Sequence, residues 1–164
     1  MGFKILYHQA ATGGISKVWQ FLAQRRDIKV IHIVRENWLA SLVSKERAKA
    51  TGIWHSVTPQ KPCALKLEPD KCLAHFELHE KRLKLFQTLF EGHEMLTLQY
   101  GDILRSFTDV IGRISGFLGV DTFESCEPAI VKIATVPLSS EVKNFYALRE
   151  FFANSRYVRF FHET

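Results

Sequence analysis

An arginine and two serines are spaced as an anion-binding site would require. Residues 28–34 form a nearly continuous apolar run, Arg35 follows it directly, and Ser41 and Ser44 come shortly afterwards. A guanidinium can hold a phosphate through two parallel hydrogen bonds, and a hydroxyl can donate a further one. These residue types therefore suggest recognition of a phosphate or sulfate group. The same pattern would arise if Arg35 paired with a surface carboxylate and the two serines were ordinary helix residues.

The elements expected around Arg35 favour the anion-binding interpretation. The apolar run at 28–34 predicts a strand covered on both faces, as strands of parallel sheets are. Asn37 can cap a helix that runs from Trp38 to about Ala50 and is ended by Thr51-Gly52. In open α/β sheets ligands bind beyond the carboxyl ends of the strands, and a helix N-terminus offers unpaired N–H groups to an anion. Arg35 lies at such a junction.

The rest of the chain predicts an α/β domain, a parallel sheet flanked by helices. Apolar runs at 3–8 and 94–100 predict two further strands. Helices are predicted at 17–24, 71–91, 107–118 and 141–153, and irregular structure at 57–70 and 122–136. The strand, helix and strand at the start of the chain imply parallel pairing. The 164 residues fit one domain, 1–164, and three strands are few for this class, so we expect its sheet to be N-terminally incomplete.

Composition and charge indicate which kinds of ligand and partner the protein can bind. The formal net charge of +5 favours anionic ligands, but the basic residues form no run, so no nucleic-acid-binding arm is expected. The three cysteines lack metal-ligand spacing, so we expect no disulfide framework, no metal site and a reducing, cytoplasmic location. The chain shows no secretory signal pattern and no apolar run of about 20 residues, so no membrane span is expected.

The segment Val30-Ile-His-Ile-Val-Arg-Glu-Asn37, followed by a helix with Ser44, resembles the 3′-phosphate-binding motif of the sulfotransferases. These enzymes use adenosine 3′-phosphate 5′-phosphosulfate (PAPS) as cosubstrate. An arginine at a strand end and a serine in the following helix hold its 3′-phosphate. The resemblance implies these two roles for Arg35 and Ser44, with Ser41 as the alternative to Ser44.

Three later segments extend the resemblance over most of the chain. Leu98-Gln-Tyr-Gly-Asp-Ile-Leu104 resembles the family's Tyr-Glu-Asp-Leu segment, with Gly101 in place of the glutamate. Residues 114–120 resemble a helix that ends in Phe-Leu-Gly, and Asn144-Phe-Tyr146 resembles an Ile-x-Asn-Tyr segment. The resemblance implies a P-loop-NTPase-like sulfotransferase fold. The family's 5′-phosphosulfate loop normally precedes the segment that matches 3–8 and is not found here, and we interpret the Gly-containing residues 10–14 as a connecting turn.

The resemblance also suggests a general base. His8 follows the first predicted strand, at the place of the catalytic histidine in cytosolic sulfotransferases. That histidine ends a Lys-Thr-His triplet, whereas this chain has Leu6-Tyr7-His8, so the lysine is absent. Other branches use a glutamate elsewhere in the fold, and a lone histidine also has a purely structural explanation. His8 is therefore the candidate base, and the identity of the base stays open.

Two functions follow from these observations. The first is a sulfotransferase that transfers a sulfuryl group from PAPS to a hydroxyl or amine of a small molecule or glycan. The alternative is a non-catalytic, sulfotransferase-like binding or assembly module without the 5′-phosphosulfate loop. A missing first strand would expose a sheet edge and favour a homodimer. A kinase-like P-loop protein is disfavoured because the chain lacks a Gly-x-x-x-x-Gly-Lys-Ser/Thr motif.

Overall fold

A two-stranded parallel sheet organises the computed structural model, which describes residues 2–7, 17–54, 63–121 and 136–162. Strand β1 (Val30–Val34) pairs with β2 (Met95–Gln99), so that Val30 lies opposite Met95 and Val34 opposite Gln99. The two strands therefore end at the same edge of the sheet. The residues that follow them, Arg35 and Tyr100, are the first to lie beyond it.

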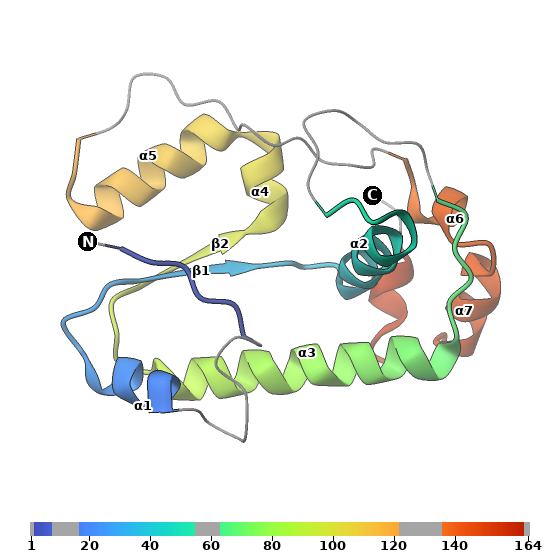
Figure 1. The fold of residues 1–164 in the computed structure, drawn as a ribbon, viewed down its shortest axis with the longest axis horizontal. Coiled ribbons are helices and arrows are strands. Elements are labelled where there is room, and N and C mark those ends of the chain that lie inside the picture. The colour runs from blue at the N-terminus through green and yellow to red at the C-terminus, as the bar shows by residue number, and fades with distance from the viewer. Residues whose placement is uncertain (1, 8–16, 55–62, 122–135, 163–164) are drawn as a thin grey trace.

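Helices connect and flank the two strands (Figure 1). In chain order they are α1 (Lys17–Gln24), α2 (Trp38–Thr51), α3 (Pro69–Leu89), α4 (Tyr100–Arg105), α5 (Phe107–Leu118), α6 (Leu138–Glu141), α7 (Phe145–Phe151) and the 3-10 helix η1 (Val158–Phe161). In Figure 1, α3 runs the length of the molecule on one side of the sheet, and α4 and α5 lie on the other. The crossover from β1 to β2 passes through α2 and α3, which confirms the predicted α/β class with a parallel sheet.

Helix α2 starts and ends where local chemistry predicts. The Asn37 side-chain oxygen accepts a hydrogen bond from the Ala40 N–H at 3.0 Å, which satisfies a backbone donor of the first turn. Gly52 follows the last turn at φ 73°, a left-handed conformation that favours a residue without Cβ. The predicted helix and both of its terminal signals are therefore confirmed.

Two apolar clusters form the core, and α3 contributes to both. Phe76 belongs to the larger cluster, between α2 and the C-terminal elements, while Phe86 and Phe90 pack with α1 in the smaller one. The larger cluster comprises Trp38, Leu39, Leu42, Val43, Leu67, Cys72, Phe76, Val142, Phe145, Leu148, Phe152, Tyr157, Phe160 and Phe161. Because one continuous helix crosses both clusters, α3 holds the sheet and the C-terminal elements in one body.

A buried ion pair ties α2 to α6. The Arg47 guanidinium donates from Nε and Nη2 to the two carboxylate oxygens of Glu141, at 2.9 and 2.5 Å. The Glu141 carbonyl in turn accepts the Leu65 N–H at 2.7 Å. Nearby, the Asn144 side chain accepts from the Leu67 N–H at 3.1 Å and donates to the Leu67 carbonyl at 2.8 Å. The segment before α3 is thus fixed between α2 and the C-terminal elements.

The structure corrects two predictions about the sheet. The described part of the predicted strand at 3–8, residues 3–7, pairs with no strand, and its Tyr7 side chain instead packs on His32 and Phe86. The apolar run at 28–34 is not covered on both faces, because His32 is buried against α3 whereas Ile33 on the opposite face is 51% exposed. The sheet therefore contains two strands within the described residues, rather than the three expected.

The C-terminal helix predicted at 141–153 is divided. Val142 adopts an extended backbone and forms an isolated parallel bridge with Leu65, so α6 ends at Glu141 and α7 begins at Phe145. The short helix α4 and the 3-10 helix η1 were not predicted. The strand predicted at 94–100 is observed as β2, which ends at Gln99 because Tyr100 starts α4. The predicted turn at 10–14 and nearly all of the predicted loop at 122–136 lie outside the described residues.

Two of the cysteines are described, and both are free thiols. Burial raises the pKa of the Cys72 thiol to about 11, which makes it an inert member of the core. Within the described ranges, no helix is both long and apolar enough to cross a membrane.

Candidate anion-binding site

Arg35 occupies the carboxyl edge of the sheet as the sequence predicts. Its guanidinium carbon lies 4.2 Å from the centroid of the Tyr100 ring. A guanidinium over an aromatic ring is attracted to the ring electrostatically and still carries N–H donors that can bind an anion. None of the ion pairs within the described residues involves Arg35. Arg35 is therefore a cation that lies over an aromatic ring at the sheet edge and has no carboxylate partner among the described residues.

The Asn37 side chain makes two hydrogen bonds at the helix N-terminus beside Arg35, one to α2 itself and one to η1. The side-chain oxygen of Asn37 caps α2, and its Nδ2 donates to the Phe160 carbonyl at 2.9 Å. The Ser41 N–H reaches the Asn37 carbonyl at 3.2 Å. The cap therefore occupies the Ala40 N–H. The backbone N–H groups of the first turn that precede Ala40 are the ones that this helix end can offer to an anion.

The two candidate serines are three residues apart and so lie one turn apart on the same side of α2. Ser41 is three residues after Trp38 and four before Lys45, so it shares their face, which is directed toward α3. Ser44 is three residues before Arg47 and shares the face of the buried ion pair. Both side chains are partly buried. Both stay predictions as phosphate donors, and helical spacing does not decide between them.

Two histidines that sequence reasoning did not select lie beside this edge. His75 and His79, one turn apart on α3, have ring centroids 4.4 Å apart, and Trp38 stacks on His79 at 5.9 Å. Burial and neighbouring positive charges lower the pKa of each to about 4; Arg82, Lys45 and Arg35 act on His79. Their spacing of four residues, with Arg82 three residues further on, is the sequence signal that would have found them.

A hydrogen-bonded tyrosine and histidine lie under the start of the sheet. The Tyr7 hydroxyl is bonded to His32 Nε2, and the His32 ring stacks on Phe86 at 4.0 Å. Burial raises the pKa of Tyr7 to about 12 and lowers the pKa of His32. Both groups are therefore neutral core residues. The neighbouring His8 lies outside the described residues and stays a prediction as the general base.

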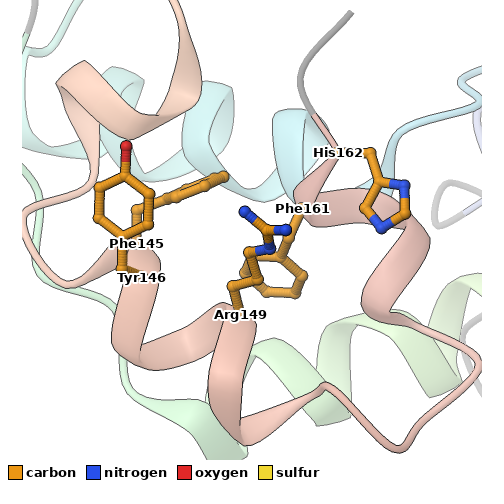
Figure 2. A pocket seen from close by; sticks show the side chains of 5 residues that line it. All are labelled: Phe145, Tyr146, Arg149, Phe161 and His162. Atoms are coloured by element: carbon orange, nitrogen blue, oxygen red, sulfur yellow. The ribbon is translucent and has the colours of Figure 1, made fainter.

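A separate hollow of about 340 Å³ lies on the C-terminal elements. Figure 2 shows the Arg149 guanidinium between the side chains of Tyr146 and His162, with Phe145 and Phe161 completing the lining. It contains none of the residues predicted to bind an anion. This hollow therefore provides control positions for experiments at the sheet edge.

The neutral histidine pair predicts how stability depends on pH. In the unfolded chain both histidines titrate near pH 6.5, whereas the folded protein holds them neutral to about pH 4. Between these values the unfolded state binds more protons, so stability is greatest above about pH 6.5 and falls toward pH 4. We expect the pair to account for a loss of roughly 1–2 kcal/mol, discounted because both rings are partly exposed.

Urea unfolding at pH 7, 6 and 5 measures this loss. The double variant His75→Gln/His79→Gln should show a flatter dependence over that interval, because only carboxylates and the other histidines then contribute. A variant that keeps the full pH dependence of the parent protein would contradict the assignment.

Comparison with known proteins places this geometry in context. The chain is similar to Nodulation protein H of Rhizobium tropici, with 29% identity over 143 residues, which is 85% of this chain and 57% of that protein. Nodulation protein H of Rhizobium meliloti is 30% identical over 140 residues, 82% of this chain and 56% of that protein. The chain thus spans just over half the length of these relatives. No protein-family model and no solved structure matches it.

Proposed function

We propose that this chain is the 3′-phosphate-binding part of a PAPS-dependent sulfotransferase. The observation that carries the proposal is Arg35, which lies over the Tyr100 ring at the shared carboxyl edge of two parallel strands and is followed at once by a capped helix. An arginine at this position agrees with the motif that residues 30–37 resemble. The similarity to Nodulation protein H over most of the chain supports a common origin.

The proposed reaction moves a sulfuryl group to a hydroxyl or amine of a small molecule or glycan. The acceptor atom attacks the sulfur of PAPS, the bond from sulfur to the 5′-phosphate oxygen breaks, and adenosine 3′,5′-bisphosphate leaves. The acceptor gives its proton to a base, for which His8 is the candidate. Arg35 holds the 3′-phosphate, with one hydrogen bond from Ser44 or Ser41, and so fixes the nucleotide relative to the acceptor.

Arg35→Ala should weaken binding of adenosine 3′,5′-bisphosphate. A hydrogen bond to a charged group contributes about 1.5–3 kcal/mol, so the dissociation constant should rise about 10- to 150-fold in a calorimetric titration. Arg149→Ala, which removes the same charge from the C-terminal hollow, should bind as the parent protein does. Unchanged affinity in Arg35→Ala would reject the site, and the same titration of Ser41→Ala and Ser44→Ala identifies the serine donor.

The alternative is a non-catalytic module of the same origin. Ile33 is exposed to 51% on a sheet face that a second copy could cover, and a contiguous apolar surface there would support such a module. A turnover assay with PAPS and phenolic, amine and glycan acceptors separates the two functions. Nucleotide binding without turnover, together with a stable homodimer in light scattering, would establish the module.

A further inference from the structure

A very short connection joins strand β1 to helix α2 at the sheet edge. The strand ends at Val34 and the helix begins at Trp38, so the connection consists of residues 35–37 and starts with Arg35. Planar peptide units leave few free dihedral angles in so short a segment. The position of the Arg35 side chain therefore depends on how the two ends of this connection are held.

The sheet holds the end of the connection that follows β1. Val34 lies opposite Gln99 in the parallel register, so the last residues of the two strands are paired. The next residue on each strand completes the arrangement, because the Arg35 guanidinium carbon lies 4.2 Å from the centroid of the Tyr100 ring. A displacement of Arg35 would therefore remove its contact with this ring.

The Asn37 side chain holds the other end through two different elements. Its Oδ1 accepts the Ala40 N–H at 3.0 Å, and its Nδ2 donates to the Phe160 carbonyl at 2.9 Å. An asparagine amide carries its acceptor and its donors on separate atoms, so one side chain can join α2 to η1. The segment that connects Arg35 to α2 is thus tied to a residue 123 positions later in the chain.

The bond between Asn37 and Phe160 lies beside a packed contact between the same two elements. The Phe160 ring lies against Trp38, the first residue of α2, with centroids 4.9 Å apart, and Phe160 is buried in the larger cluster. A hydrogen bond to the carbonyl of a buried residue is costly to lose, because water replaces it poorly. The bond therefore restrains the position of Asn37 relative to η1.

We propose that Asn37 is a positioning residue for the anion-binding site, through which the C-terminal helix η1 fixes the connection that carries Arg35. Two peptide units separate Asn37 from Arg35 and transmit the restraint from one residue to the other. Asn37 acts through Arg35 and not on the ligand itself. The inference rests on the proposed function for the identity of the ligand, adenosine 3′,5′-bisphosphate, and gives the C-terminal elements a part in its binding.

Asn37→Ser separates the two hydrogen bonds of this side chain. Serine caps helices about as well as asparagine, but it lacks the amide nitrogen that reaches Phe160. In a calorimetric titration with adenosine 3′,5′-bisphosphate we expect the dissociation constant to rise about tenfold. In the Arg35→Ala background the same substitution should change it less than about twofold, because its effect passes through Arg35. Asn37→Thr keeps the cap in the same way and serves if Asn37→Ser does not fold.

Asn144→Ser is the matched control for a loss of stability alone. The Asn144 side chain also makes two hydrogen bonds, both to the backbone of Leu67, and so holds the segment before α3 and not the connection to α2. Asn144→Ser should lower the urea midpoint as Asn37→Ser does, but change the affinity for the nucleotide less than about twofold.

The NMR signals of the Arg35 side chain give a second measurement, which needs no ligand. Arg35 lies over the Tyr100 ring, and the ring current shifts the signals of protons near the ring face. In Asn37→Ser these signals should move toward the values of an exposed arginine, whereas in Asn144→Ser they should stay as in the parent protein.

The outcomes separate the positioning role from the proposed function. Equal losses of affinity in Asn37→Ser and Asn144→Ser, or unchanged Arg35 signals in Asn37→Ser, would overturn the positioning role. An undiminished effect of Asn37→Ser in the Arg35→Ala background would also overturn it. If the parent protein bound no nucleotide while the Arg35 signals still depended on Asn37, the function would be rejected and the positioning role retained. Nucleotide binding that depends on Arg35 but not on Asn37 would retain the function and reject the positioning role.

Discussion

Glu141→Ala is expected to lower the free energy of unfolding by about 3–5 kcal/mol. The substitution leaves the Arg47 guanidinium buried, with both of its hydrogen bonds to the carboxylate lost. An uncompensated buried charge is among the most destabilising changes that one residue can cause. Urea unfolding at pH 7 measures the loss as a lower midpoint.

Two further variants establish the cause of this loss. Glu150→Ala removes an exposed carboxylate of the neighbouring helix α7 and should change stability by less than about 0.5 kcal/mol. Arg47→Met/Glu141→Leu replaces both charges with apolar side chains of similar size and should be much more stable than Glu141→Ala. If the double variant were as unstable as the single one, packing at this position, and not the unpaired charge, would be responsible.

Phe76→Ala is expected to lower the free energy of unfolding by about 3–5 kcal/mol. The Phe76 ring is fully buried in the larger cluster and contacts the rings of Phe152, Tyr157 and Phe160, with centroids 5.1 to 5.5 Å away. Its removal leaves a cavity between α3 and the C-terminal elements that rigid aromatic neighbours cannot fill. A matching drop in the thermal midpoint should accompany the loss.

Leu78→Ala, two residues further along α3, is the matched control. Its side chain is 45% exposed, so the same helix loses an apolar side chain without a cavity in the core. We expect a change below about 1 kcal/mol. If both variants lost similar free energy of unfolding, the cause would be the changed helix propensity of α3 and not the packing of the larger cluster.

Local signals made much of the fold predictable. Asn37 and Gly52 fixed the ends of α2, and Gly119 the end of α5, because caps and left-handed glycines act on the residues next to them. The position of Arg35 was predictable for a related reason: a residue that follows a parallel strand must emerge at the carboxyl edge of the sheet.

Pairing between distant segments could not be predicted. Val142 leaves the helical conformation because it bridges Leu65, and the partner of Arg47 lies 94 residues away. The strand expected at 3–8 failed for the opposite reason, since an apolar run becomes a strand only beside a partner, and Tyr7 packs on the core instead. The histidine pair was overlooked because its significance depends on Lys45 and Arg35, which other elements bring to it.

The double role of Asn37 has a consequence for synthesis of the protein. The residue that starts α2 also binds the Phe160 carbonyl, 123 residues later in the chain. At translation rates of about 5–20 residues per second, roughly 6 to 25 seconds separate the synthesis of these two partners. During that interval the nascent chain lacks the contact from η1 that holds Asn37, so the sheet edge is unfinished. Ligand should therefore bind ribosome-bound chains only after η1 has emerged from the exit tunnel.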